Sequence, residues 1–363
     1  MTNSPGIITV VRMDNLGDQV LGTGLLRSLR SHYPRARLLL AVPERLAGLY
    51  QRCPLPDMVL PLPSRHEYPG NEEDLGALAP QLASLGKADL VVNPRFAEDD
   101  YAAGPLCSAL AAPGARIIGF RQTRTTIPGY DPNAFYTELV QAPESLHTAQ
   151  YARLIANAVI GRDADAPPET WFEAADWERV AERWLLEAGQ FVVVGVGASS
   201  AHKVPAGAVY VGLLDHLLAG SHRVVLAGDA NEAAFADSLI ARVSGSYPTG
   251  IACAAGELSL PELAALLARA KLYIGPDAGP KHMAAAAGTP VVEISPVPAD
   301  YPSTSRGPTA AGHCWRPWNT RFRSVHPDRE AFARTRDQAS FRTQPIPGIS
   351  SQALAEAVEQ MLA

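Results

Sequence analysis

Short apolar runs alternate with longer amphipathic stretches along most of the chain. The apolar runs are rich in Val, Ile and Leu, which is typical of buried parallel strands, whereas the stretches between them place apolar residues at helical spacing. The alternation predicts an α/β fold in which parallel sheets are wound with crossover helices. We expect strands at 7–12, 37–42, 89–93, 116–120, 191–196, 223–227, 271–275 and 290–294. We expect helices at 18–32, 206–218, 232–243, 260–270, 279–287 and close to the C-terminus.

The pattern is interrupted once, at residues 161–169, by a charged segment that contains two prolines and has the composition of a linker. A chain of 363 residues also exceeds what one hydrophobic core usually organises. We therefore expect an N-terminal lobe over 1–165 and a C-terminal lobe over 166–345. An amphipathic helix within 346–363 follows the cap signal Ser350-Ser351 and could return to the N-terminal lobe.

Composition narrows the class of protein. Hydrophobic residues make up 47% and charged residues 19% of the chain, which is typical of a globular protein. The formal net charge is -6 and neither half is basic, so nucleic acid is not an expected partner. The four cysteines are scattered without a Cys-x-x-Cys pair, which predicts neither a metal site nor a disulfide framework. The start is short and polar, and no apolar run approaches ~20 residues, so we expect a cytoplasmic protein with at most peripheral membrane contact.

The segment 271–295 holds the most informative pattern. A strand runs into Asp277-Ala278-Gly279-Pro280, and a helix of small residues follows. The first turn of such a helix directs unpaired amides towards the carboxyl edge of the sheet, where phosphate binds well. Lys281 and His282 could add charge and hydrogen-bond donors. The alternative is a well-capped helix that binds nothing.

A second candidate lies at the first strand. Arg12 ends that strand, and Asn15-Leu16-Gly17-Asp18 leads into the first helix. We expect Gly17 to permit the turn, and Asp18 to remain ionised near the helix N-terminus. An ionised carboxylate there could accept the proton of an attacking hydroxyl, although Asp18 could also serve only as a helix cap.

Two further segments carry polar groups. Ser199, Ser200 and Lys203 follow the strand at 191–196 and could neutralise a leaving diphosphate, or could be solvated surface. The stretch 306–342 holds eight arginines against three acidic residues. It is either a solvated loop with surface ion pairs or a binding segment for phosphate groups.

These motifs together resemble the lipopolysaccharide heptosyltransferase family, glycosyltransferase family 9. The resemblance rests on Val-Val-Arg before Asn-Leu-Gly-Asp, on Gly-Ala-Ser-x-x-x-Lys, and on Leu-Tyr-Ile-Gly-Pro-Asp-Ala-Gly-Pro-x-His-Met-Ala-Ala-Ala-x-Gly-Thr-Pro-Val-Val. It implies a GT-B fold, in which two Rossmann-like lobes with parallel sheets face a central cleft, the N-terminal lobe for the acceptor and the C-terminal lobe for the nucleotide sugar. It also implies an inverting transfer, without metal or cofactor, of a heptosyl or related sugar from a nucleoside-diphosphate sugar to an acceptor hydroxyl. ADP-heptose is the first candidate donor.

The resemblance also implies roles for individual residues. Asp18 matches the general base, and Lys203 matches a diphosphate contact that assists catalysis. The acceptor side is assigned Arg12, Asn15 and Gly17, and the donor side is assigned Ser199, Ser200, Asp229, Glu232, Asp277, Ala278, Gly279, Lys281 and His282. The chain departs from the family at two positions. Ala230 stands where a ribose-binding carboxylate is common, with Asp229 and Glu232 on either side, and Ala278 replaces a hydroxyl residue.

Three other functions are compatible with the residues. Gly22-x-Gly24 and Gly195-x-Gly197 match part of a dinucleotide fingerprint, but Arg27 and Ser200 take the place of the third glycine, which disfavours a nicotinamide dehydrogenase. A sugar-nucleotide epimerase of GT-B fold and a non-catalytic nucleotide-sugar-binding protein are the other two.

The acceptor is the least determined partner. Up to residue 170 the chain holds 15 basic against 18 acidic residues, which suits a soluble, weakly charged or cationic acceptor such as a natural-product intermediate. A lipopolysaccharide core glycolipid is the alternative.

Overall fold

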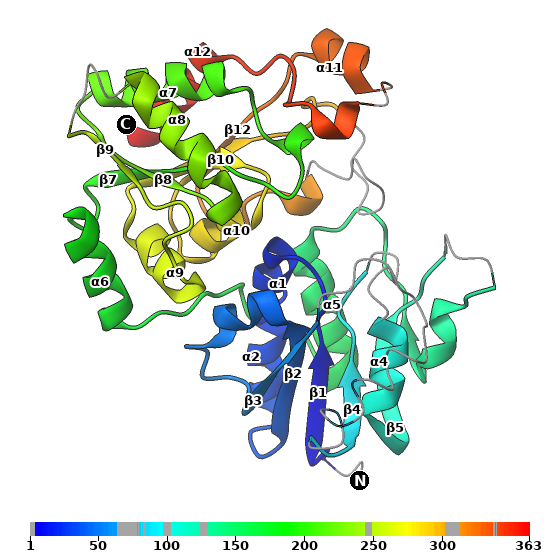
Figure 1. Ribbon diagram of the computed structural model, residues 1–363. Helices are drawn as coiled ribbons and strands as arrows, with labels where there is room; N and C mark the ends of the chain where they lie inside the picture. Colours follow the sequence, from blue (N-terminus) through cyan, green and yellow to red (C-terminus); the bar gives the residue numbers. More distant parts are fainter. Residues whose placement is uncertain are drawn as a thin grey trace. The chain divides into compact units, whose positions relative to one another are not determined.

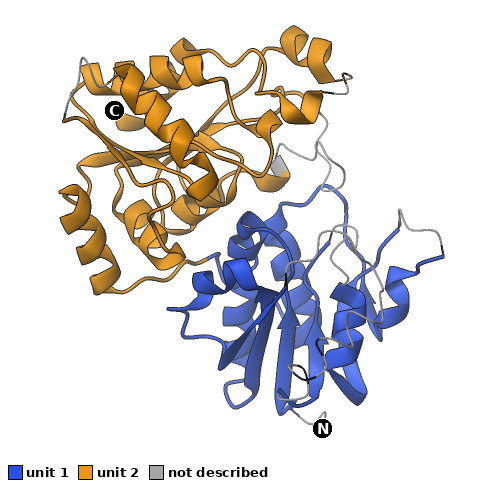
Figure 2. Cartoon of the chain, in the orientation of Figure 1, with its two compact units in different colours: residues 1–168, 304–308 blue, residues 169–303, 309–363 orange. Residues whose placement is uncertain are grey.

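The computed structural model describes residues 4–63, 78, 80, 82, 85–96, 103–123, 129–243, 249–301, 313–336, 338 and 340–363. The described residues form two compact units, one ending at Pro168 and the other beginning at Glu169 (Figure 2). The boundary falls inside the segment 161–169 that has the composition of a linker.

The first unit is built on a parallel sheet with the strand order β3-β2-β1-β4-β5-β6 (Figure 1). Its strands are β1 (Ile7–Val11), β2 (Arg37–Pro43), β3 (Met58–Leu62), β4 (Ala88–Val92), β5 (Ala111–Phe120) and β6 (Glu138–Val140). The central strand β1 pairs with β2 and β4, and all its residues after Ile7 are buried. This burial explains why its sequence is apolar apart from Thr9, because both faces of a central parallel strand are covered.

The first unit has two short helices where the sequence predicts a single helix over 18–32. The helices of this unit are α1 (Leu16–Leu21), α2 (Thr23–His32), α4 (Ala103–Leu110) and α5 (Thr148–Ile160), with 3-10 turns at Glu44–Tyr50 and Pro132–Phe135. The predicted helix over 18–32 is divided at Gly22. A Cβ atom at Gly22 would lie 2.9 Å from the guanidinium carbon of Arg12, so the buried arginine occupies the space that a side chain would need.

The second unit repeats this topology with the order β12-β11-β10-β7-β8-β9, again with all neighbours parallel. Its strands are β7 (Phe191–Gly195), β8 (Arg223–Ala227), β9 (Ile251–Cys253), β10 (Leu272–Pro276), β11 (Val291–Ile294) and β12 (Phe322–Val325). Its helices are α6 (Ala174–Trp184), α7 (Gly207–Ala219), α8 (Ala233–Val243), α9 (Leu260–Arg269), α10 (Gly279–Ala286), α11 (Arg329–Arg336) and α12 (Ser351–Leu362). Short 3-10 turns lie at Ala201–Lys203, Ala230–Glu232, His313–Trp315 and Phe341–Thr343.

The C-terminal helix α12 belongs to the second unit. It begins after Ser350, whose hydroxyl accepts a hydrogen bond from the Ala353 amide. It packs within the second unit, where Leu354, Val358 and Met361 join the core formed with α7 and the sheet. The expected return of this helix to the N-terminal lobe stays a prediction. The apolar face of the helix is already buried in its own unit.

Other differences concern the sheet edges and the arginine-containing segment. The sequence pattern does not predict β3, β6, β9 or β12, which are short strands at the edges of the two sheets and are only partly buried. Within 306–342, residues 306–312 lie outside the described residues, and the described part contains β12 and α11 instead of a continuous loop.

The shared topology determines where ligands can bind. In each sheet the strand order reverses between two central strands, β1 and β4 in the first unit and β7 and β10 in the second. Loops that leave the carboxyl ends of such strands diverge and leave a crevice, which is where open α/β sheets bind ligands. Within the described residues, no helix is long and apolar enough to cross a membrane.

Candidate active site

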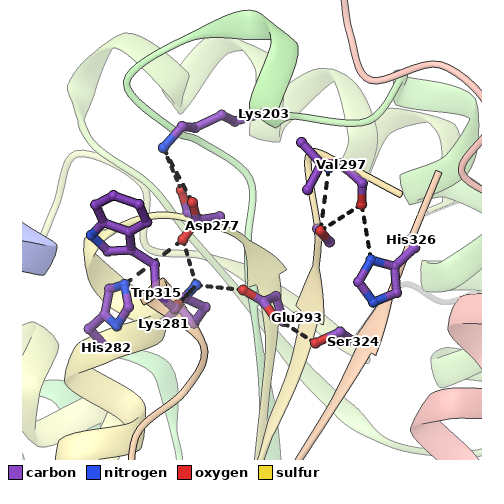
Figure 3. A network of polar contacts seen from close by, with 10 residues as sticks. Lys203, Asp277, Lys281, His282, Glu293, Val297, Trp315, Ser324 and His326 are labelled. Carbon is purple, nitrogen blue, oxygen red and sulfur yellow. Dashed lines mark hydrogen bonds and ion pairs between the residues drawn. The ribbon is translucent and has the colours of Figure 1, made fainter. Parts of the chain in front are cut away.

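The second unit holds a cluster of charged residues at the carboxyl end of β10 (Figure 3). Asp277 directly follows β10 and is 6% exposed. One carboxylate oxygen, Oδ1, lies 2.5 Å from Nζ of Lys281, and the other, Oδ2, lies 3.4 Å from Nζ of Lys203. His282 Nε2 lies 3.9 Å from Oδ1. Asp277 therefore connects the start of α10 to the loop that follows β7.

Lys281 is fully buried and does not lie at the surface of the site. Its ammonium group donates to Asp277, to Oε1 of Glu293 at 2.6 Å and to the carbonyl oxygen of Trp315 at 2.6 Å. Three donors are all that an ammonium group has. Lys281 was expected on the donor side, and in the structure its ammonium group is inaccessible and fully engaged. His282 is also buried, at 2% exposure.

These contacts shift the acid-base behaviour of the pair. Burial alone would raise the pKa of Asp277, but Lys281, Lys203 and His282 outweigh it and hold that pKa well below its usual value. Burial alone would lower the pKa of Lys281, but Asp277 and Glu293 outweigh it and raise that pKa. Both groups therefore remain ionised at neutral pH.

The helix α10 begins directly beside this pair. Ala278 is its N-cap, in an extended conformation and with no side-chain cap, and Gly279 is its first residue. Among the described residues the N-cap therefore provides no side-chain hydrogen bond to the first turn, because Ala278 has a methyl group in place of a hydroxyl. A helix start of this kind is suited to an anionic ligand.

The loop after β7 carries the accessible polar groups. Ser199 is exposed, and Ser200 is half-buried and precedes the 3-10 turn with no side-chain cap. The Lys203 side chain is 27% exposed, and its ammonium donates to both the carbonyl and the carboxylate of Asp277 at 3.4 Å. Among the assigned lysines, Lys203 is thus the one that an incoming ligand can reach.

Asp229 and Glu232 follow β8 and cap the turn at Ala230–Glu232 reciprocally. The Asp229 carboxylate accepts from the Asn231 amide at 2.7 Å, and Glu232 accepts from the Asp229 amide at 2.6 Å. Burial, reinforced by the Asp229 carboxylate, raises the pKa of Glu232. A Cβ atom at Gly197 would lie 2.2 Å from the Glu232 carboxyl carbon, so this glycine allows Glu232 to lie over the loop after β7.

The glycine pairs have a packing explanation that needs no dinucleotide. A Cβ atom at Gly195 or Gly275 would lie 2.2 or 2.4 Å from the Tyr273 hydroxyl, which is buried and has no hydrogen-bond partner among the described residues. In the first unit, a Cβ atom at Gly24 would lie 2.1 Å from the Ala166 carbonyl oxygen. These close approaches account for glycine at each position, which weakens the dehydrogenase alternative further.

In the first unit, the loop after β1 is organised by a buried ion triplet. Asp14 is 1% exposed and pairs with Arg12 at 2.9 Å and with Arg95, just past β4, at 2.5 Å. Burial alone would raise the pKa of Asp14, but the two guanidinium groups outweigh it and lower that pKa. Arg12 also donates to the Asp18 carbonyl at 2.5 Å. Arg12 is therefore a buried support of the loop, and its assignment to the acceptor side stays a prediction.

The remaining first-unit residues lie on α1. Asn15 is its N-cap, and its side-chain oxygen accepts from Arg45 at 2.8 Å. Gly17 lies within the helix without a positive φ, so the expected turn at Gly17 is wrong. Asp18 is half-buried in the first turn of the helix. The helix starts at Leu16, earlier than predicted, because Asn15 already has extended N-cap geometry.

Several residues that organise these sites were not singled out from the sequence. Glu293 lies in a strand that is otherwise apolar, and a lone charge in a buried strand is itself a signal of a buried partner. Asp14, Arg45 and Arg95 gave no such signal, because their contacts join segments far apart in the chain. Within the described residues, no group of three or more His, Cys, Asp or Glu side chains is placed to hold a metal ion.

The comparisons with known proteins agree with these two sheets and their motifs. Residues 106–342 match the family model described as glycosyltransferase family 9 (heptosyltransferase). The chain belongs to glycosyltransferase family 9. It is similar to lipopolysaccharide heptosyltransferase 3 of Escherichia coli, at 27% identity over 197 residues, a match that spans 53% of each protein.

Solved structures show that family 9 proteins share the fold. A family 9 glycosyltransferase of Veillonella parvula superposes with a TM-score of 0.73 at 17% identity, covering 98% of this chain and 97% of the other. E. coli ADP-heptose lipopolysaccharide heptosyltransferase II gives 0.68 at 18% identity and covers 98% of both chains. The expected α/β fold with two Rossmann-like units of the GT-B type is thus confirmed.

We predict that Asp277→Asn destabilises this family 9 protein by about 3 kcal/mol at pH 7, because it breaks a buried ion pair. The folded-state pKa of Asp277 lies below that of an unfolded chain, about 3.9. The stabilisation is therefore fully present above about pH 4 and is lost as the pH falls. Urea unfolding measured from about pH 3 to about pH 8 should show that the difference in free energy of unfolding between variant and parent shrinks as the pH falls.

Asp163→Asn is the matched control for this measurement. Asp163 pairs with Arg153 at 2.6 Å, but 68% of its side chain is exposed. Solvent screens such a pair, so no measurable change is expected. An Asp277→Asn difference that is absent at pH 7, or that does not vary with pH, would contradict the prediction.

Proposed function

We propose that this protein transfers a heptosyl or related sugar from a nucleoside-diphosphate sugar to an acceptor hydroxyl, with inversion of configuration and without a catalytic metal. The observation that carries the proposal is the Lys203–Asp277 pair beside the uncapped start of α10, at the strand reversal of the second sheet, in a family 9 chain. ADP-heptose is the proposed donor because the similar E. coli heptosyltransferase II is named for it. A cytoplasmic location stays a prediction.

On the donor side, the chemistry requires compensation of the charge that develops on the departing diphosphate. Lys203 is the reachable cation, and Ser199 and Ser200 offer hydroxyl donors on the same loop. The amides of Ala278 and Gly279 open α10 and can donate to a phosphate oxygen. Donors fixed in advance stabilise this charge without reorganising during the reaction, so the protein itself can take the role that a metal has elsewhere.

On the acceptor side, Asp18 is the proposed general base. The acceptor oxygen forms a bond to the anomeric carbon as the bond from that carbon to the diphosphate oxygen breaks, and the hydroxyl proton passes to the Asp18 carboxylate. Attack from the face opposite the diphosphate inverts the configuration. The Arg12 contact to the Asp18 carbonyl and the Asn15 contact to Arg45 fix the helix turn that carries the base. A base that is already held in place reduces the entropic cost of reaching the geometry for proton transfer.

The direct test is release of ADP from ADP-heptose by the purified protein. We expect release that depends on an acceptor hydroxyl, because an inverting transferase needs both substrates. Two acceptor classes should be offered in parallel, a soluble weakly charged or cationic sugar and a lipopolysaccharide core glycolipid. The proposed acceptor is the soluble one, and faster transfer to the core glycolipid would overturn that part. If no acceptor causes release of the corresponding nucleoside diphosphate from any nucleoside-diphosphate sugar tried, the whole proposal is overturned.

For the acceptor side, we predict that Asp18→Ala lowers kcat by about 10²- to 10⁴-fold, the usual contribution of a general base. The Kd for ADP should stay within about twofold, because the proposed contact is with the acceptor proton and not with the donor. Single-turnover kinetics and calorimetric titration measure the two quantities. Asp163→Asn, an exposed carboxylate of the same unit, is the control. Turnover close to that of the parent would remove Asp18 from the mechanism.

For the donor side, we predict that Lys203→Ala raises the Kd for ADP by about 10- to 100-fold, the loss of one or two hydrogen bonds to a charged group. His282→Ala should weaken ADP binding as well, because it removes the imidazole that lies 3.9 Å from the Asp277 carboxylate. Lys271→Ala removes an exposed lysine of the same unit and should have no effect. Transfer by the parent should persist with EDTA present, and an absolute requirement for an added divalent ion would contradict the proposed charge compensation.

A further inference from the structure

We propose that Lys281 is a positioning residue that neutralises Asp277 from beneath, so that Lys203 stays available as the cation for the donor diphosphate. The inference rests on the proposed function, because it assigns the donor phosphates to the Lys203 side of the cluster. It concerns the buried part of Figure 3, in which dashed lines join the Lys281 ammonium to Asp277 and to Glu293.

The distances show which lysine satisfies Asp277. Its Oδ1 contact with Lys281 is 2.5 Å, whereas its Oδ2 contact with Lys203 is 3.4 Å. Lys281 is 0% exposed and Lys203 is 27% exposed. The short buried pair therefore carries most of the charge compensation for Asp277, because Coulomb attraction is strongest at short range and away from water. The longer, accessible pair leaves the Lys203 ammonium able to turn to a phosphate oxygen.

Glu293 completes the arrangement from the opposite side. It lies on β11, its Oε1 accepts from Lys281 at 2.6 Å, and its Oε2 accepts from the Ser324 hydroxyl of β12 at 2.6 Å. Ser324 and Glu293 are register partners on adjacent parallel strands. The sheet thus fixes Glu293, and Glu293 together with the Trp315 carbonyl fixes Lys281 against Asp277.

The formal charges predict in which direction each substitution changes anion binding, and a purely structural role would not predict this. Asp277, Lys281, Glu293 and Lys203 sum to zero, with the negative charge of Glu293 furthest from Lys203 in the chain of contacts. Removing the charge of Glu293 alone makes the cluster more positive and should not weaken binding of an anion. Removing Lys281 and Glu293 together leaves Asp277 to be neutralised by Lys203, and this should weaken binding of an anion.

The test compares three variants by calorimetric titration with ADP. The double variant Lys281→Met/Glu293→Leu replaces the buried pair by apolar side chains of similar size, a change that folded proteins often tolerate. We expect its Kd for ADP to rise about tenfold, the equivalent of one hydrogen bond to a charged group. Glu293→Gln keeps the hydrogen bonds to Lys281 and Ser324, and its Kd should stay equal or fall. Ser295→Ala alters a buried hydroxyl on the same side of the sheet that bonds only to Val297 among the described residues, so it is the matched control.

A second measurement needs no nucleotide. Lys203 should react more slowly with acetic anhydride in the double variant than in the parent, because Asp277 then draws its ammonium closer, and peptide mass spectrometry reports the rate at this one lysine. Equal Lys203 labelling, or Glu293→Gln and the double variant weakening ADP binding alike, would overturn the positioning role. If the parent itself binds no ADP, the proposed donor is wrong, and the labelling rate still decides the role of Lys281. If the double variant does not fold, the Glu293→Gln variant decides. A higher Kd for ADP than that of the parent overturns the inference, and an equal or lower Kd supports it.

Discussion

The charged cluster at the end of β10 depends on one buried ammonium group. Lys281 joins Asp277 at the end of β10, Glu293 within β11 and the Trp315 carbonyl through contacts of 2.5 to 2.6 Å. A buried ammonium is tolerated only when its charge is paired and its donors are all used, and both conditions hold here. Any change that opens one contact leaves an uncompensated charge inside the protein. The position of Asp277, and through it that of Lys203, therefore follows from this single interaction.

The first unit uses the inverse arrangement, a buried carboxylate held by two arginines. Asp14 pairs with Arg12 and Arg95, which follow β1 and β4 on either side of the strand reversal. The triplet connects the ends of two strands that are far apart in sequence, and it supports the turn on which Asp18 lies. In both units, then, the groups proposed for chemistry are exposed or half-buried, and a fully buried ion pair beneath them determines their positions.

Close backbone approach is the second constraint common to the units. Gly22 leaves room for Arg12, Gly197 for the Glu232 carboxyl group, and Gly195 with Gly275 for the Tyr273 hydroxyl. Each glycine is thus fixed by a particular side chain that packs over it. Packing of this kind accounts for the glycines of the partial dinucleotide fingerprints without a bound dinucleotide.

The sequence by itself determined the fold class, the central strands and the donor-side motif, because these depend on local signals. Buried parallel strands need continuous apolar runs, and the step from Asp277 to Gly279 is a helix start that can be recognised from a few residues. The tertiary structure alone decided which polar residues are accessible. Lys281 and Lys203 look equivalent in sequence, yet one is 0% and the other 27% exposed, because burial depends on partners such as Glu293 and Trp315 that approach from other elements. The edge strands, the break at Gly22 and the place of α12 were decided in the same way, by what packs against them and not by the residues they contain.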